Sequence, residues 1–153
     1  MRIVLQRVSQ ARVTVDGETT GEIGRGLLLL VGLGTEDGEE EIEYWVRRVP
    51  ELRIFPDEQG RMNRSVMEVG GGILAVPNFT LYAEVSKGRR PGFGAGAKPE
   101  RAAALFERFT TALGARGVQV EAGRFGEHME VALVNDGPVT LILDDAAVRG
   151  NRE

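Results

Sequence analysis

Two short segments of the chain place polar and turn-forming residues where ordinary strands do not need them. They are Pro77-Asn78-Phe79-Thr80-Leu81 and Asn135-Asp136-Gly137-Pro138-Val139-Thr140. Taken alone, the second segment is typical of a hairpin turn, because turns favour Asn, Asp, Gly and Pro. The first contains Thr80, whose hydroxyl could attack an ester. An activated nucleophile needs a partner base, however, and the sequence offers no evident one.

The composition excludes several common kinds of catalytic site. The chain has no cysteine, which rules out thiolate nucleophiles, disulfides and cysteine-ligated zinc. Its single histidine, His128, leaves little room for a Ser-His-Asp arrangement. His128 also stands at the entry to a predicted strand, which favours a surface or structural role. We therefore expect chemistry that uses no cofactor.

Acidic and glycine-rich stretches suggest ligand sites that the residue types do not support. Acidic residues cluster from Glu36 to Glu41. Acids at the start of a helix favour the positive end of its dipole, so we predict a solvated helix start there and no metal site. Gly70-Gly71-Gly72 lacks the Gly-Lys-Ser/Thr of a phosphate loop and is interpreted as a turn. Gly32-Leu33-Gly34 lacks a third glycine and is a weak dinucleotide signal.

The overall charge gives no sign of a nucleic-acid partner. The formal net charge is −4 at pH 7, so no global positive field attracts RNA, and any contact must be local. The one compact basic patch is Lys87-Gly88-Arg89-Arg90, inside a Gly/Pro-rich stretch from Ser86 to Pro99. Alone, such a charge run is more often a solvated loop than a binding site.

Length and hydropathy predict one domain and a cytoplasmic location. With 153 residues the chain can bury a core without disulfide or metal staples. No apolar run approaches membrane-spanning length, and the first residues are too polar for a signal peptide. We therefore expect no membrane partner.

The periodicity of apolar residues predicts a single α/β domain over residues 1–143, followed by a polar tail at 144–153. About eight strands are expected, at 3–15, 18–23, 26–32, 52–55, 73–76, 118–121, 129–134 and 139–143. Pro77 should interrupt the fifth strand, with 78–81 resuming it. One helix is expected from about Asp37 to Val49, ended by Pro50. A second should begin at Pro99 and end at Gly114 or Gly117.

Together, the two unusual segments resemble the motifs of the D-aminoacyl-tRNA deacylases, which are Ser-Gln-x-Thr on one strand and Asn-x-Gly-Pro-Val-Thr near the C-terminus. The resemblance runs from Met1 to about Leu143. It includes Gln6-Arg7-Val8, Gly21-Glu22-Ile23-Gly24, Gly26-Leu27-Leu28, Arg53-Ile54-Phe55, Met62-Asn63, Lys87-Gly88-x-Arg90-Pro91-x-Phe93 and Gly123-Arg124-Phe125. It implies a deacylase-type fold, in which the strands form mixed, barrel-like layered sheets.

The resemblance also implies an activity and an assembly. Relatives are homodimers with the active site at the subunit interface, and they hydrolyse the ester between a D-amino acid, or glycine, and the terminal adenosine of tRNA. Gly137-Pro138 would be a cis peptide whose carbonyls project into the partner's pocket. An L side chain would be driven into those carbonyls and a D side chain would point away, which is selection by a built-in clash.

Site residues follow from the same resemblance. The backbone N–H of Phe79 would contact the oxyanion or the ester. We favour a positioning role for Thr80 over a nucleophilic one. Arg7 would brace the carbonyls of Gly137-Pro138. The remaining substrate contacts are assigned to Pro77, Asn78, Met129, Asn135 and Asp136. The basic residues Lys87, Arg89 and Arg90 would contact the phosphates of the tRNA acceptor end.

The chain departs from the family pattern at one point, since it has Pro77-Asn78 where most relatives have Ser-Gln. A related group of deacylases that accepts L-alanine, and holds Gly-Pro in trans, also carries proline at this position. Arg7 and the intact Asn-Asp-Gly-Pro-Val-Thr segment favour the D-specific group instead. A non-catalytic tRNA-binding module is a third possibility, because the altered pair lies in the catalytic motif.

Overall fold

The structure, a computed structural model, describes residues 1–145. In that range it has eight strands, two α-helices and two short 3-10 helices. In chain order they are β1 (Arg2–Val15), β2 (Glu18–Ile23), β3 (Gly26–Gly32), α1 (Glu39–Arg48), η1 (Val49–Glu51), β4 (Phe55–Pro56), β5 (Met62–Arg64), β6 (Gly72–Pro77), η2 (Phe79–Tyr82), α2 (Pro99–Ala115), β7 (Gln119–Ala122) and β8 (Glu130–Asp144). The predicted α/β class, two helices and about eight strands are confirmed.

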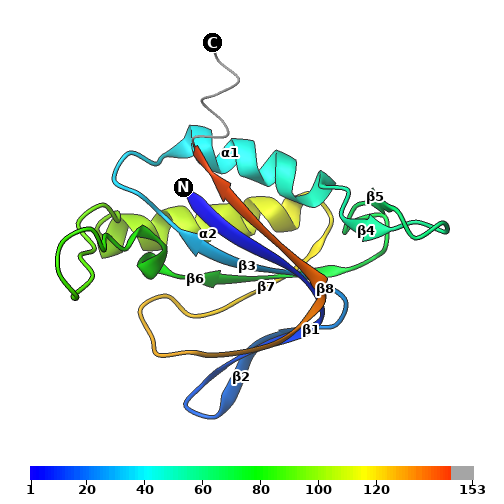
Figure 1. Cartoon of the computed structure of the whole chain (residues 1–153), viewed down its shortest axis with the longest axis horizontal. Helices are drawn as coiled ribbons and strands as arrows, with labels where there is room; N and C mark the ends of the chain where they lie inside the picture. The colour runs from blue at the N-terminus through cyan, green and yellow to red at the C-terminus, as the bar shows by residue number, and fades with distance from the viewer. Residues whose placement is uncertain (146–153) are drawn as a thin grey trace.

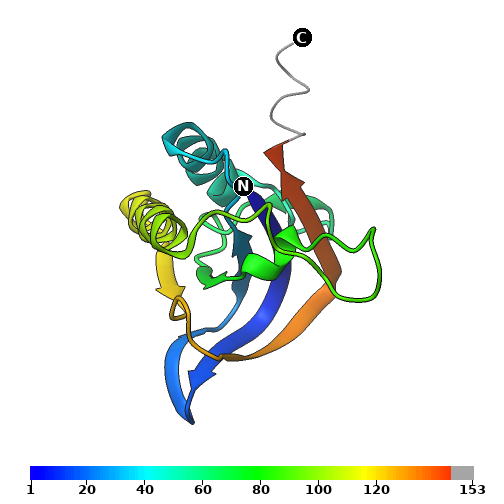
Figure 2. The ribbon, with the colours of Figure 1, turned by 90° about the vertical axis from the view of Figure 1, so that its left-hand side faces the viewer.

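The main sheet is mixed and strongly curved (Figures 1 and 2). Its strands follow the order β2-β1-β3-β6-β7, and β8 pairs with the other edge of β1. The long β1 is antiparallel to β2, β3 and β8, whereas β3, β6 and β7 run parallel. Both long strands bend, so the sheet folds back on itself as a nearly closed barrel.

Both faces of the central sheet are buried. Helices α1 and α2 lie side by side across one face (Figure 1). On that face Leu27 and Leu29 of β3 belong to one core cluster. Leu28, between them, belongs to a second cluster on the opposite face, which the curvature of the sheet encloses. Burial on both sides explains why β3 is a continuous apolar run.

The helices bury the apolar stripes that their spacing predicts. Helix α1 buries Ile42, Trp45 and Val46, and it ends before Pro50, which lies in η1. Helix α2 begins at Pro99, where a missing N–H leaves no partner unsatisfied, and ends before Gly117. Its buried residues are Ala102, Leu105, Phe106, Phe109 and Leu113.

Three strand predictions are wrong. Residues 78–81 do not resume the strand after Pro77, because Asn78 caps the 3-10 helix η2. The strand predicted at 52–55 is reduced to β4, which pairs only with β5, a strand not predicted at all. The two strands predicted at 129–134 and 139–143 are one bent strand, β8.

The end of the domain also differs from the prediction. Asp144 is the last residue of β8 and pairs with Arg2, so the strand reaches one residue beyond the predicted boundary at 143. The rest of the predicted polar tail, from 146 to 153, lies outside the described residues. Within residues 1–145, no helix is both long and apolar enough to cross a membrane.

Candidate active site

The turn after β6 presents the first of the two unusual segments. The Asn78 backbone N–H donates to the carbonyl of Val31 at 2.8 Å, which fixes the turn to the end of β3. The Asn78 side-chain oxygen then accepts from the Thr80 backbone N–H at 3.1 Å, an N-cap contact for η2. The Thr80 hydroxyl donates to the same oxygen. An amide oxygen is not a base, so this arrangement does not activate Thr80 as a nucleophile.

The backbone N–H of Phe79 is available to a ligand. It opens η2, where the first N–H groups of a helix have no internal partner. In the part of the chain that the structure describes, no acceptor pairs with it. The Phe79 side chain is 61% exposed, and its ring packs edge-on against Phe93, with the ring centroids 5.0 Å apart. A donor of this kind can stabilise an oxyanion.

An apolar cavity of about 340 Å³ opens beside η2. Its walls come from the ends of β3 and β6, from the segment before α2 and from the loop before β8. They include Val31, Leu33, Pro77, Phe79, Phe93, Ala97 and Phe125. Cavities of this size, apolar with a few polar groups at the edge, are typical of small-ligand sites.

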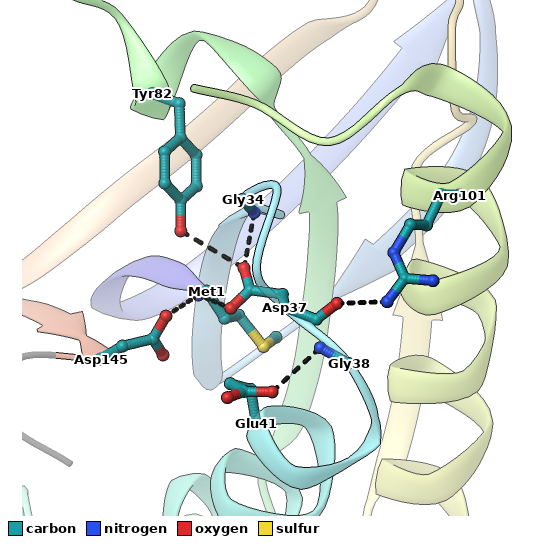
Figure 3. A network of polar contacts seen from close by, with 8 residues as sticks. All are labelled: Met1, Gly34, Asp37, Gly38, Glu41, Tyr82, Arg101 and Asp145. Carbon is teal, nitrogen blue, oxygen red and sulfur yellow. Dashed lines mark hydrogen bonds and ion pairs between the residues drawn. The ribbon is translucent and has the colours of Figure 1, made fainter. Parts of the chain in front are cut away.

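A buried polar network holds the far end of η2 (Figure 3). The Asp37 carboxylate accepts from the Gly34 backbone N–H at 2.5 Å, from the Met1 amino group, and from the Tyr82 hydroxyl at a longer 3.4 Å. Arg2 stacks on the Tyr82 ring, 4.7 Å from its centroid. Burial, with the Asp37 charge, raises the pKa of Tyr82, so its hydroxyl stays protonated and remains a donor.

This network corrects the prediction for the acidic cluster. Glu39, Glu40 and Glu41 lie in the first turn of α1, as the solvated helix start requires. Asp37 does not belong to that solvated group, because only 2% of it is exposed. Its partners lie 3, 36 and 45 residues away along the chain, and a local charge pattern carries no signal for them. Among the described residues, no group of three or more His, Asp or Glu side chains could hold a metal.

The second unusual segment is a wide bulge in β8 rather than a hairpin turn. Gln6 pairs with Thr140 and Val8 with Asn135, so residues 136–139 lie opposite Arg7 alone. The Asn135 side-chain amide donates to the carbonyls of Arg7 and Val139, each at 3.0 Å, and thereby ties the base of the bulge together.

Arg7 fills the space behind this bulge. Its Nε donates to the Asp136 carbonyl and also lies 3.2 Å from the Asp136 carboxylate. Its Nη1 donates to the carbonyl of Ile54 at 2.6 Å. Only 8% of Arg7 is exposed. A guanidinium can satisfy several acceptors from one rigid plane, so Arg7 holds the bulge in a fixed position.

Gly137 must be glycine in this bulge. Its φ of +132° lies in a region that L side chains rarely adopt. A Cβ at Gly137 would lie 2.8 Å from Val139 Cγ2 and 3.1 Å from Arg7 Nη2. The Gly137–Pro138 peptide is cis, and both residues are exposed.

The two unusual segments do not meet within one chain. Arg7, opposite the bulge, pairs with Leu27 near the start of β3, whereas Pro77 pairs with Val31 near its end. This separation is about 13 Å along the strand direction. In addition, β1 and β3 lie between β8 and β6. In Figure 1, η2 lies at the left end of the sheet and the bend of β8 lies toward the right.

Met129 and His128 are neighbours in the loop that precedes β8. Met129 lies near Pro77, since both side chains pack around Gly123. A Cβ added at Gly123 would lie 2.7 Å from Met129 Sδ and 3.5 Å from Pro77 Cδ. His128 is exposed, in agreement with the predicted surface role. No contact places it against Thr80 within the described residues.

The basic patch lies on an exposed loop that follows η2. Glu84 and Gly92 exchange two backbone hydrogen bonds, of 2.7 and 2.8 Å, which close the loop at its neck. Lys87, Arg89 and Arg90 lie at the exposed tip, and Phe93 follows the neck directly. In Figure 2, which views this end of the molecule, the loop projects from η2.

Comparisons with known proteins agree on one family. The D-Tyr-tRNA(Tyr) deacylase family model matches residues 4–144. A D-aminoacyl-tRNA deacylase of Symbiobacterium thermophilum is 55% identical over 94% of this chain and 95% of its own length. A D-aminoacyl-tRNA deacylase of Thermus aquaticus is 51% identical over 99% of this chain and its full length. The chain belongs to the D-aminoacyl-tRNA deacylase family.

Solved structures give the same fold for this deacylase-family chain. The structure titled c-Myc DNA Unwinding Element Binding Protein has a TM-score of 0.88 and 40% identity, with 94% of this chain and 98% of that chain covered. A probable eukaryotic D-amino acid tRNA deacylase has a TM-score of 0.79 over the same shares of both chains. At 24% identity, that second likeness supports the fold alone.

Sequence reasoning missed three residues of this candidate site. Asp37 and Tyr82 anchor η2, and Phe93 packs on Phe79. Phe93 did carry a signal, because it ends one of the segments that resemble the family. Asp37 and Tyr82 belong to no such segment.

Proposed function

We propose that this chain hydrolyses the ester bond of D-aminoacyl-tRNA and of glycyl-tRNA, releasing the amino acid and free tRNA. The observation that carries the proposal is the unpartnered N–H of Phe79 beside an apolar cavity. Membership of the deacylase family supplies the class of ester. The chain has no cysteine, and none of the residues that line the cavity is a histidine, so we propose that the chemistry rests on orientation and on stabilisation of charge.

The cavity beside η2 suits the terminal adenosine of tRNA. Its walls are largely apolar, and the exposed ring of Phe79 offers aromatic surface on which a base can stack. An adenosine bound there would carry its aminoacylated ribose past the N–H of Phe79 at the edge of the cavity. The substrate ester would then lie within reach of the donor that its transition state needs.

The proposed reaction needs only water as a co-reactant. Water attacks the ester carbonyl, and the carbonyl oxygen gains negative charge that the Phe79 N–H stabilises. The C–O bond to the ribose then breaks, and the ribose oxygen takes up a proton as it leaves. An aminoacyl ester is already activated, and its neighbouring ribose hydroxyl can help to orient the water. Thr80 positions this part of the site through its contact with Asn78.

A second copy of the chain would bring the bulge of β8 to the cavity. Within one chain, the pairing of β1, β3 and β6 keeps the two segments about 13 Å apart along the strands. The bulge is exposed, and so are Val134 and Ile142 on β8, at 48% and 73%. Exposed apolar side chains beside a functional segment favour a protein interface. We therefore propose a homodimer in which each bulge faces the cavity of its partner.

In that dimer the bulge would act as a chirality filter. Arg7 and Asn135 hold its backbone, so its carbonyls are rigid probes that no side-chain movement can withdraw. An L side chain on the bound ester would collide with them, whereas a D side chain would point away. Glycine has no side chain and would pass. The pocket rejects one hand rather than recognising one side chain, which is consistent with a broad set of D-amino acids.

The test is turnover of D-tyrosyl-tRNA by the purified chain, together with its mass in solution. We expect more than one ester cleaved per active site and the mass of a dimer by sedimentation. Saturable tRNA binding without cleavage, at high protein concentration, would instead support a non-catalytic binding module. A monomer with full activity would contradict the shared site.

The proline at position 77 motivates a second candidate, a deacylase that also accepts L-alanine. Pro77 is buried beside Met129 and Gly123 and lines the cavity, so its side chain can affect the shape of the substrate site. Release of L-alanine from tRNA at a rate similar to that of glycine would favour this candidate. Release of glycine alone would favour the D-specific enzyme.

A further inference from the structure

Phe93 joins two parts of the molecule that have separate tasks. Its ring packs against the ring of Phe79 at an interplanar angle of 73°, with the centroids 5.0 Å apart. It also follows the neck of the basic loop, and only Pro91 and Gly92 separate it from Arg90. The Phe93 side chain therefore contacts Phe79, whose N–H is proposed to bind the ester. Phe93 also adjoins the basic loop, which is proposed to bind tRNA phosphates.

The backbone on both sides of Phe93 is fixed. Before it, the paired hydrogen bonds between Glu84 and Gly92 close the loop. After it, the Gly96 N–H donates to the Phe93 carbonyl at 3.2 Å, and the Ala97 N–H donates to the carbonyl of Leu33 at 2.9 Å. These hydrogen bonds hold Phe93 at the base of the loop, with only Pro91 and Gly92 between it and Arg90.

The contact between Phe79 and Phe93 is not part of the hydrophobic core. Phe79 is 61% exposed and Phe93 is 39% exposed, and neither belongs to the buried clusters on the two faces of the sheet. Removal of the Phe93 ring therefore opens no buried cavity, and the fold does not depend on it. The pair lies instead between the loop and the cavity, so it can link the two.

We propose that Phe93 is a positioning residue that couples the hold of the basic loop on tRNA phosphates to the placement of the Phe79 N–H. This inference rests on the proposed function. When Lys87, Arg89 and Arg90 engage the tRNA, the neck of the loop is drawn into one position, and the Phe93 ring holds Phe79 in register with the ester. Binding energy gained away from the ester is thereby used to orient the reacting groups.

The test is single-turnover deacylation of D-tyrosyl-tRNA over a range of enzyme concentrations, which separates the maximal rate from the half-saturating concentration. The variants are Phe93→Leu, Phe93→Tyr and the control Val85→Ala, each with and without Arg90→Ala. Val85 lies in the same loop and is 67% exposed, so its loss matches the removal of apolar surface.

Phe93→Leu should lower the maximal rate about 2- to 10-fold, as the loss of one aromatic pair implies. The half-saturating enzyme concentration should stay within about twofold of the wild-type value. Phe93→Tyr keeps the ring contact and should restore the rate. Arg90→Ala should lower the maximal rate in the wild type, but should affect only half-saturation when combined with Phe93→Leu.

Three results would overturn the proposal. If the wild type cleaves and Phe93→Leu behaves like Val85→Ala, the coupling is wrong and the proposed function stands. Full additivity of Phe93→Leu and Arg90→Ala leads to the same conclusion. If the wild type itself releases no D-tyrosine, the proposed function and the coupling both fail. Thermal unfolding of Phe93→Leu within a few degrees of the wild type shows that the fold of this variant is intact.

Discussion

The Arg7 guanidinium lies behind the bulge of β8 and donates through Nε to the backbone carbonyl of Asp136 at 3.2 Å. The same side chain donates to the carbonyl of Ile54, so it ties the bulge to the segment before β4. Arg7 is nearly buried, whereas Asp136, Gly137 and Pro138 are exposed. A rigid buried residue thus supports an exposed backbone segment, which is the arrangement that a filter made of backbone atoms requires.

Replacing Arg7 by lysine should weaken the filter more than it weakens catalysis. A lysine ammonium cannot match the planar, fixed pattern of contacts that Arg7 makes with two carbonyls and a carboxylate. We expect the ratio of D-tyrosine to L-tyrosine release to fall by about tenfold, which corresponds to about 1.4 kcal/mol. Arg12→Lys, at an exposed position on the same strand, is the matched control and should leave the ratio unchanged. An unaltered ratio in Arg7→Lys would exclude Arg7 as the support of the filter.

Thr80→Ala should retain most of the deacylation rate, because the Thr80 hydroxyl contacts an amide oxygen and not a base. Asn78→Ala should have the larger effect, since it removes the cap of η2 and costs about 1 kcal/mol. The check is the maximal single-turnover rate of both variants on D-tyrosyl-tRNA. Complete loss of activity in Thr80→Ala, with an intact fold, would revive the nucleophilic role.

Arg90→Ala should weaken tRNA binding and reduce its dependence on salt. Each phosphate contact releases counterions, so the slope of log K against log salt should fall by about 1 in magnitude. Arg108→Ala is the control, because Arg108 is an exposed arginine on α2 that pairs with Glu39. The test is tRNA binding measured from low to moderate salt. An unchanged slope in Arg90→Ala would show that Arg90 does not contact a tRNA phosphate.

Asp37→Ala should destabilise the fold by about 1–3 kcal/mol, because the buried Gly34 N–H loses its acceptor and the Met1 amino group keeps only Asp145 as a partner. Tyr82→Phe should cost no more than about 1 kcal/mol, since it removes one long hydrogen bond. Glu36→Ala, an exposed neighbour, is the control. Urea unfolding gives the three values, and equal stability of Asp37→Ala and Glu36→Ala would contradict the role of the buried network.

Local patterns predicted those elements whose packing is repetitive. The apolar stripe of α1 and the proline at the start of α2 gave helices close to those observed, and the apolar run of β3 gave a strand buried on both faces. Such elements follow from side-chain periodicity and from backbone donors alone. The resemblance to the family added the residues of both unusual segments.

Patterns failed where a specific contact of one side chain, local or distant, decides the structure. Asn78 to Leu81 alternate like a strand, but the cap that Asn78 offers to Thr80 turns the backbone into η2. The segment from Asn135 has the composition of a hairpin turn, but its pairing with β1 makes it a bulge behind which Arg7 lies. Asp37 belongs to an acidic cluster that is typical of a solvated helix start, yet two of its partners come from remote parts of the chain. Neither composition nor spacing contains these long-range partners.

The measurement that tests the central claim most directly compares D-tyrosyl-, glycyl- and L-tyrosyl-tRNA under identical single-turnover conditions with the wild-type chain. Rejection by the bulge of β8 predicts release of D-tyrosine and of glycine, with L-tyrosyl-tRNA left intact on the same time scale. Release of L-tyrosine at the rate of D-tyrosine would contradict the filter, whatever the other variants show.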